Sequence, residues 1–121
     1  MHTILIADDD FISLEILKAM LAQFPLRIVT ATNGTEAIAL ATEEQPKLLI
    51  LDYEMDDLTG AEVCAKLREM NEFTDTPIIA LTGHQSSNHL DQCRAAGMNQ
   101  TLHKPVAPDA LQQLLQQHGL I

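Results

Sequence analysis

The sequence has few cysteines, few basic side chains and no long apolar run, and each shortage excludes a class of protein. Two cysteines without tandem spacing exclude a disulfide scaffold or a zinc ribbon and suit a reducing compartment, so we expect a cytoplasmic protein. Seven basic against seventeen acidic residues give a net charge of −10, which repels phosphate backbones and anionic lipid. We therefore expect no binding to nucleic acid or to membranes. The longest apolar runs, such as residues 48–51, are too short to span a bilayer, and the strand-like residues right after Met1 leave no room for a signal peptide.

The composition is that of an ordinary globular domain. Apolar residues make up 46% and charged residues 20% of a chain of 121 residues, which excludes intrinsic disorder. A chain of this length buries enough surface for a core without disulfides or structural metals. The sequence shows no internal repeat, low-complexity tract or linker, so we expect a single domain over residues 1–121.

Short apolar runs alternate with segments of helical period along the whole chain. The runs are residues 3–7, 27–31, 48–51, 77–81 and 98–102. The first, third and fourth are continuous rather than alternating, which is typical of strands covered on both faces. Such alternation predicts an α/β fold of the (βα)5 type, a doubly wound parallel five-stranded sheet with right-handed crossovers and helices on both faces.

The helical segments have apolar stripes and recognisable ends. The first stripe comprises Ile12, Ile16, Leu17, Met20, Leu21 and Phe24. Asn33 with Glu36, and Thr59 with Glu62, have the spacing of capping boxes. The segment 87–96 is a further predicted helix that ends at Gly97.

Acidic side chains follow the first and third predicted strands at the points where these strands end. They are Asp8, Asp9, Asp10, Asp52, Glu54, Asp56 and Asp57. Thr82 follows the fourth strand and Lys104 the fifth, and the carboxyl ends of parallel strands meet at one edge of a sheet. Two like charges about 4 Å apart repel by roughly 4 kcal/mol at an effective dielectric constant of about 20, so a hard cation is the natural compensation. The joint placement predicts one shared site that holds Mg²⁺.

These residues resemble the receiver domain of two-component response regulators. The similarity covers residues 4–10 (ILIADDD), 49–55 (LILDYEM) followed by Gly60, 78–83 (IIALTG) and the pair Lys104-Pro105. The stretch 93–99 (CRAAGMN) is most similar to receivers attached to hybrid histidine kinases or acting in multistep phosphorelays. The resemblance implies a flavodoxin-like strand order of 2-1-3-4-5.

The resemblance also implies a function and a set of site residues. Asp52 is expected to accept a phosphoryl group from a phosphohistidine of a sensor histidine kinase or a histidine phosphotransfer protein. Mg²⁺ would be held by Asp9, Asp52 and the main-chain carbonyl of Glu54, with Asp8 acting through water. Lys104 and Thr82 would bind phosphoryl oxygens, and the Lys104-Pro105 peptide is expected to be cis.

Further expectations concern the domain as a signalling unit. Phosphorylation would switch the domain surface, and the domain would catalyse only its own phosphorylation and dephosphorylation. A chain that ends at residue 121 would pass its output to a partner or to a C-terminal output domain beyond this sequence.

Three positions depart from the receiver pattern, and one of them, Thr59 in place of a common aspartate, costs little because it serves as a helix cap before Gly60. Asp56 stands where proline is usual, so we expect a more mobile loop after the third strand. Thr101 stands where an aromatic residue usually moves inward on activation, so we expect weaker coupling at the fifth strand, with the response passing through Thr82 and the Gly83-His84 loop.

Other interpretations remain open at this stage. A haloacid-dehalogenase-type phosphatase also uses an aspartate nucleophile and Mg²⁺, but its paired acids follow the nucleophile, whereas here the acidic pair precedes Asp52. A pseudo-receiver that only binds proteins is a second alternative, and a nucleotide-binding fold is disfavoured because no glycine-rich loop follows the first strand. We expect Cys64 and Cys93 to be buried thiols, and Tyr53 either to flank the site or to pack on the surface.

Overall fold

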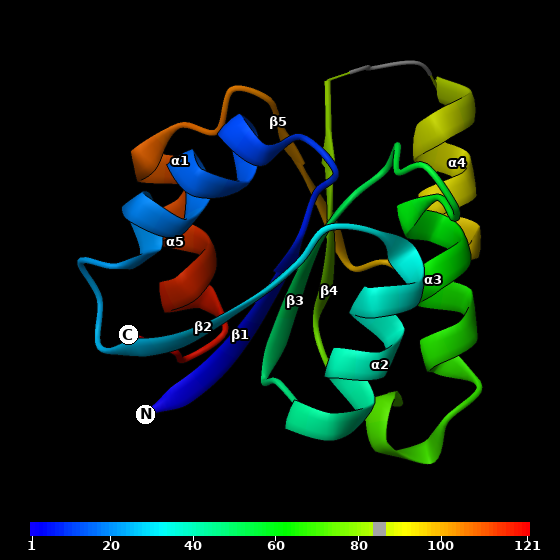
Figure 1. Cartoon of the computed structure of the whole chain (residues 1–121), viewed down its shortest axis with the longest axis horizontal. Helices are drawn as coiled ribbons and strands as arrows, with labels where there is room; N and C mark the ends of the chain where they lie inside the picture. The colour runs from blue at the N-terminus through cyan, green and yellow to red at the C-terminus, as the bar shows by residue number, and fades with distance from the viewer. Residues whose placement is uncertain (84–86) are drawn as a thin grey trace.

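Five parallel strands form the centre of the computed structural model, which describes residues 1–83 and 87–121 (Figure 1). The strands are β1 (His2–Ala7), β2 (Leu26–Ala31), β3 (Leu48–Asp52), β4 (Ile78–Thr82) and β5 (Gln100–His103). Their order is β2-β1-β3-β4-β5, so the predicted fold class and strand order are confirmed. His84, part of the predicted coupling loop, lies outside the described residues.

Helices cover both faces of the sheet (Figure 1). Helices α1 (Phe11–Leu21) and α5 (Pro108–Gln117) pack on one face, and α2 (Gly34–Glu44), α3 (Gly60–Arg68) and α4 (Ser87–Ala95) pack on the other. A short 3-10 helix, η1 (Asn71–Phe73), precedes β4. None of the described helices combines the length and apolarity needed to cross a membrane.

The central strands are buried on both sides, which explains their continuous apolar runs. Every residue of β3 and β4 is buried, and each face of the sheet carries its own apolar cluster. Cys64 and Cys93 belong to the cluster beneath α3 and α4 at 0% and 3% exposure, so the prediction of buried thiols is confirmed. This two-sided burial fixes the carboxyl ends of β1, β3 and β4 beside one another.

The buried face of α1 differs from the predicted stripe. Leu14, Leu17 and Leu21 are at most 3% exposed and pack on the sheet. Ile12 and Ile16 are 68% and 57% exposed, because at about 100° per residue they project from the opposite side of the helix. The predicted stripe was wrong in these two residues, since a helix that is apolar on most sides does not show by spacing which face is buried.

Most strand boundaries move by one residue from the prediction, but β5 begins two residues later. Gly97 ends the α4 segment in a left-handed conformation with φ of 97°, which a residue with a side chain rarely adopts. Met98 then donates its N–H to the carbonyl of Cys93 at 3.0 Å and is buried. Met98 therefore belongs to the turn that ends α4, and its apolar side chain serves the core rather than the strand.

Of the two predicted capping boxes, the one at α3 is confirmed, and the one at α2 is confirmed only for the Asn33 side chain. Thr59 and Glu62 form a reciprocal capping box at α3. Asn33 caps α2 by accepting from the N–H of Glu36 at 2.8 Å. The Glu36 carboxylate instead accepts from the N–H of Thr32 at 3.0 Å, so the reciprocal half predicted for Asn33 was wrong.

Candidate functional site

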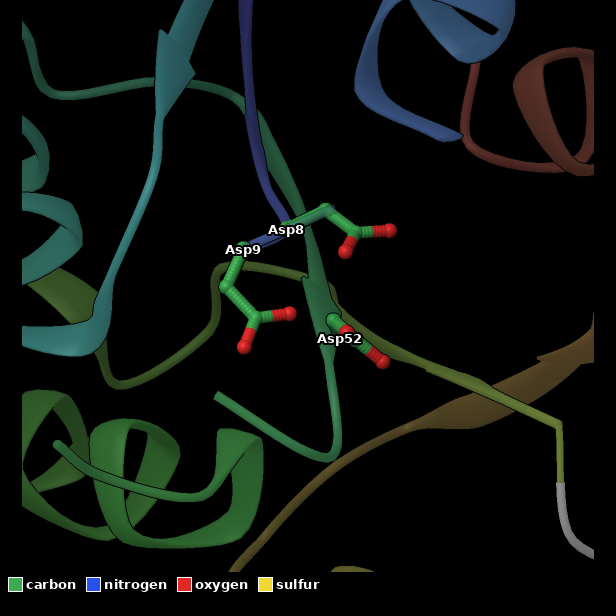
Figure 2. Close-up of side chains that lie close together, drawn as sticks. All are labelled: Asp8, Asp9 and Asp52. Carbon is green, nitrogen blue, oxygen red and sulfur yellow. The ribbon is translucent and has the colours of Figure 1, made fainter. Parts of the chain in front are cut away.

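Three carboxylates meet where β1 and β3 end. Asp8 and Asp9 directly follow β1, and Asp52 is the last residue of β3. One carboxylate oxygen from each lies within 4.8 Å of the others, and Figure 2 shows the three side chains gathered between the two strand ends. The structure thus brings together three of the residues predicted to hold a metal.

Lys104 is the cation beside these carboxylates. Its Nζ lies 2.9 Å from an Asp8 oxygen and 3.3 Å from an Asp52 oxygen. The main-chain N–H of Lys104 donates to the carbonyl of Thr82 at 2.9 Å, which ties the end of β5 to the end of β4. The Lys104-Pro105 peptide is cis, as predicted. Lys104 therefore reaches the buried Asp8 and Asp52 side chains from the far edge of the site.

Burial and crowding oppose ionisation of Asp52. Desolvation, a hydrogen bond with Asp8 and the charge of Asp8 raise the pKa of Asp52 to about 7, although Lys104 opposes the shift. Burial alone would lower the pKa of Lys104, but Asp8 and Asp52 outweigh it and raise that pKa. One ammonium is thus insufficient compensation for two buried carboxylates, and Asp9 adds a third charge close by.

A cavity of about 530 Å³ opens above these side chains. Its walls are Asp9, Asp52, Tyr53, Glu54, Met55, Asp56, Thr82, Gly83 and Lys104. Thr82 is 3% exposed at the end of β4, and Glu54 lies in the loop after β3. All the predicted site residues except the buried Asp8 therefore line one cavity, and Asp8 lies beneath it, paired with Lys104.

The residues present fit a hard divalent cation. Carboxylate and main-chain oxygens are the donors that Mg²⁺ prefers, and three carboxylates face a single lysine here. The raised pKa of Asp52 has the same origin, because negative charge at this point lacks compensation. A cation bound among Asp8, Asp9 and Asp52 would remove that repulsion.

Gly60 allows the loop after β3 to return close to the strand end. A Cβ on Gly60 would lie 2.6 Å from the carbonyl oxygen of Asp52, a contact that no side chain tolerates. The N–H of Gly60 donates to the carbonyl of Tyr53 at 2.9 Å and closes the loop. This glycine thereby holds the start of α3 against the residue that bears the central carboxylate.

Tyr53 both lines the cavity and packs against α4. Its ring is 6% exposed and stacks on His89, with 4.4 Å between ring centroids and 29° between ring planes. Its hydroxyl donates to the side-chain carbonyl of Gln92. Burial raises the pKa of Tyr53, so the phenol remains protonated and remains a donor. The prediction that Tyr53 flanks the site is confirmed, and the alternative of packing on the surface was wrong, because the side chain is buried in the core cluster. The link to α4 was not predicted.

The remaining acids of the two clusters divide into separate roles. Asp10 caps α1 by accepting from the N–H of Ile12 at 3.1 Å. Asp56 faces Asp9. Burial is the largest cause of the raised pKa of Asp9, and the charge of Asp56 and a hydrogen bond with Asp56 raise this pKa further. Asp57 points away from the cavity and binds the start of α2. The sequence predicted Asp56 and Asp57 only as members of the acidic cluster after the third strand, and it missed the role of Asp57, whose partners lie more than twenty residues upstream.

Comparison with known proteins agrees with this geometry. A model of the response regulator receiver domain matches residues 4–116. The signal transduction histidine-protein kinase BarA of Escherichia coli strain K12 is 26% identical over 113 residues, which are 93% of this chain and 12% of BarA. The chain thus spans a small part of that relative.

Two solved structures share the fold over nearly their whole length. The chemotaxis protein CheY4 of Vibrio cholerae superimposes with a TM-score of 0.91 at 29% identity, covering 97% of this chain and 98% of that one. The receiver domain of the sensor histidine kinase PA1611 of Pseudomonas aeruginosa PAO1 has a TM-score of 0.89 at 28% identity, with 96% and 95% covered, and holds a magnesium ion in its active site cleft. The family match, the strand order and the acidic site agree: this chain belongs to the response regulator receiver domain family, the phospho-accepting signalling domains of two-component systems rather than classical enzymes.

Proposed function

We propose that Asp52 is the phosphoryl acceptor of this receiver domain, which comprises residues 1–121. The observation that carries the proposal is the position of Asp52 at the end of β3. Its carboxylate lies 3.3 Å from Lys104 Nζ, within 4.8 Å of the Asp8 and Asp9 carboxylates, and in the wall of the cavity. Among the carboxylates that line this cavity, it is the one that Lys104 contacts.

The proposed reaction transfers a phosphoryl group from nitrogen to oxygen. A carboxylate oxygen of Asp52 attacks the phosphorus of a phosphohistidine and forms the new P–O bond as the P–N bond breaks. The electron pair of the P–N bond stays on the imidazole nitrogen of the donor. Lys104 pairs with a phosphoryl oxygen as a compact positive charge, and the Thr82 hydroxyl donates to another.

The acidic residues are the proposed metal ligands. Asp9, Asp52 and the main-chain carbonyl of Glu54 would hold Mg²⁺, and Asp8 would act through water. When bound, Mg²⁺ neutralises negative charge on the phosphoryl oxygens. The magnesium ion in the cleft of the PA1611 receiver domain supports this assignment. The same side chains would assist attack of water on the aspartyl phosphate, so the domain would catalyse its own phosphorylation and dephosphorylation and no other reaction.

The donor is proposed to be a sensor histidine kinase or a histidine phosphotransfer protein that docks on α1. Phe11, Ile12 and Ile16 are 57% to 69% exposed on this helix. A small apolar hollow between α1 and the loop from β5 to α5 is lined by Ile16 and Lys104, so this surface is continuous with the proposed phosphoryl site. An apolar helix of the donor would cover these side chains while its histidine reaches the cavity.

The proposal extends to the signalling relay and the cellular compartment in which the domain works. BarA carries its match to this chain within a histidine kinase, which supports a role in a relay between histidine and aspartate. The two buried free thiols are in keeping with a reducing compartment, and we place the domain in the cytoplasm. Its output would pass to a partner protein or to an additional output domain.

Incubation with acetyl phosphate and Mg²⁺, followed by intact mass measurement, tests the proposal. A receiver gains one phosphoryl group per chain, and Asp52→Asn gains none because the isosteric amide is not a nucleophile. Catalytic consumption of acetyl phosphate without a lasting adduct would support a phosphatase instead. Absence of both results would indicate a pseudo-receiver.

A further inference from the structure

The carboxylate of Asp57 binds the start of α2 from the loop after β3. Its Oδ1 accepts from the N–H of Gly34 at 2.8 Å, and its Oδ2 accepts from the N–H of Thr35 at 2.9 Å and from the Thr35 hydroxyl at 2.5 Å. Oδ1 also accepts from the N–H of Leu58 at 2.8 Å within its own loop. These bonds lower the pKa of Asp57, which keeps the carboxylate ionised near the positive end of the helix.

Asp57 completes the cap of α2 from a distant part of the chain. The first four N–H groups of a helix lack partners within it. At α2, Asn33 accepts from Glu36 and Ala37, through its side chain and its carbonyl respectively. Asp57 accepts from the two preceding N–H groups, those of Gly34 and Thr35, so the N–H groups of residues 34 to 37 all have acceptors.

The fit between the loop and α2 is too close for a side chain at residue 34. A Cβ on Gly34 would lie 2.7 Å from the Cβ of Leu58 and 3.2 Å from Oδ1 of Asp57. The glycine therefore permits the loop to rest directly on the helix. Close packing and hydrogen bonding act at the same place and hold the loop against α2.

This contact fixes the middle of a loop whose ends are already fixed. The loop is closed by the hydrogen bond from Gly60 to Tyr53, and Glu54 and Asp56 line the cavity between that closure and Asp57. Proline, which would stiffen this loop, is absent from it. We propose that Asp57 is a positioning residue of the metal site: by binding Gly34 and Thr35 it holds the loop so that the Glu54 carbonyl faces Asp9 and Asp52. This inference rests on the proposed metal site.

Titration of the whole chain with MgCl₂, followed by amide chemical shifts, tests this role. Asp57→Ala is expected to weaken Mg²⁺ binding on the order of tenfold, as is typical when a group that orients a metal ligand is removed. Thr35→Val, which removes only the hydroxyl bond, is expected to weaken binding to a smaller extent, and Thr35→Ser is expected to restore it. Glu44→Gln is the matched control, because it disrupts the Arg27–Glu44 ion pair at the other end of α2 and leaves the loop contact intact.

Three outcomes would overturn the inference, and they are distinguishable. If the Gly34 and Thr35 amides lose protection from hydrogen exchange in Asp57→Ala while the Mg²⁺ affinity equals that of the wild type, the contact exists but does not position the site. If the wild-type chain itself binds no Mg²⁺, the proposed metal site fails and this inference fails with it. Equal loss of affinity in Glu44→Gln would show that general destabilisation, rather than the loop contact, lowers the affinity.

Discussion

Burial and the neighbouring Asp8 oppose ionisation of Asp52 when no cation is bound. Desolvation and Asp8 raise its pKa to about 7, and the two carboxyl groups titrate as a pair rather than independently. The two roles proposed for Asp52, nucleophile and metal ligand, both require the ionised form. The proposed acceptor is therefore a residue whose charge the folded protein opposes.

A pH dependence of Mg²⁺ binding follows from this shift. A carboxyl with a raised pKa holds a proton in the folded state that a bound cation must displace, so Mg²⁺ binding should release a proton below about pH 7. We predict that the Mg²⁺ affinity falls by up to about tenfold per pH unit below that value and is nearly constant above pH 8. Titrations at pH 5.5, 7 and 8.5 measure this, and equal affinities at all three would contradict the shift. Asp52→Asn is the control, since it removes the titrating group.

In the absence of metal, the contribution of Asp52 to the free energy of unfolding should fall as the pH rises, whereas the Mg²⁺ affinity rises with pH. Because the folded pKa of Asp52 exceeds the unfolded value, the folded state binds more protons between about pH 4 and pH 7. The contribution of this group to the free energy of unfolding is therefore complete below its unfolded pKa and is lost as the pH rises through about 7. Mg²⁺ offsets that loss by pairing with the ionised form.

At the scale of single elements, α1 combines a core face with an apolar solvent face. Leu14, Leu17 and Leu21 hold the helix on the sheet, whereas Ile12 and Ile16 are exposed, and Ile16 lines the hollow that Lys104 also lines. The spacing of apolar residues correctly predicted that Leu17 and Leu21 are buried. It did not distinguish the apolar face that packs on the sheet from the apolar face that is exposed to solvent. An exposed apolar face beside a reactive site is typical of a docking surface.

We predict that Ile16→Ser lowers phosphoryl transfer from a phosphorylated histidine phosphotransfer domain by at least about fivefold, the cost of losing about 1 kcal/mol of interface contact. Labelling by acetyl phosphate should be unchanged, because the small donor needs no docking surface. Ile121→Ser is the control, since Ile121 is an exposed isoleucine at the other end of the chain. Equal rates for Ile16→Ser and wild type with the protein donor would exclude α1 as the docking helix.

The second element of interest is α4, which contacts the site through Tyr53. Thr101 of β5 is half-buried and lines a hollow beside α4 that is also lined by Leu90 and Cys93, and none of the described residues that line this hollow is aromatic. Tyr53, adjacent to Asp52, instead stacks on His89 and binds Gln92. The sequence identified the missing aromatic residue, but only the fold shows which ring touches α4.

We predict that a fluoroberyllate mimic of the phosphoryl group shifts the amides of the 53–59 loop, Thr82, Gly83 and α4 more than those of Thr101 and Leu102. Tyr53→Phe should reduce the response of α4, because the ring remains but its hydrogen bond to Gln92 is lost. Shifts at Thr101 as large as those beside Asp52 would show that β5 transmits the signal without an aromatic residue.

At the scale of the whole molecule, the alternation of strands and helices was predictable because the central strands are buried on both faces. The strand-end acids were predictable for the same reason, since parallel strands bring their carboxyl ends together. The contact of Asp57 with Gly34 and Thr35 was not, because no local spacing relates a loop to a helix more than twenty residues earlier. The expectation that the loop at Asp56 is mobile stays a prediction. The contact of Asp57 with α2 restrains the same loop, as a proline in this loop would.

Mg²⁺ should stabilise the whole fold, since it binds a site that only the folded chain assembles. At a concentration ten times the dissociation constant, binding adds about 1.4 kcal/mol to the free energy of unfolding. We predict that millimolar Mg²⁺ raises the melting temperature and that Asp9→Ala removes most of this rise. Asp9→Ala should also stabilise the metal-free chain, because one of three crowded charges is gone. Identical melting curves with and without Mg²⁺ would count against the metal site.

The measurement that tests the account most directly is the identity of the phosphorylated residue. Borohydride reduces an aspartyl phosphate to homoserine, and sequencing of the reduced peptides by mass spectrometry locates that residue. After treatment with acetyl phosphate and Mg²⁺, homoserine should appear at residue 52 and nowhere else, and Asp52→Asn should yield none. Homoserine at Asp8, Asp9 or Asp56 in the wild-type chain, or a phosphoryl adduct that yields no homoserine, would contradict the assignment of Asp52 as the acceptor.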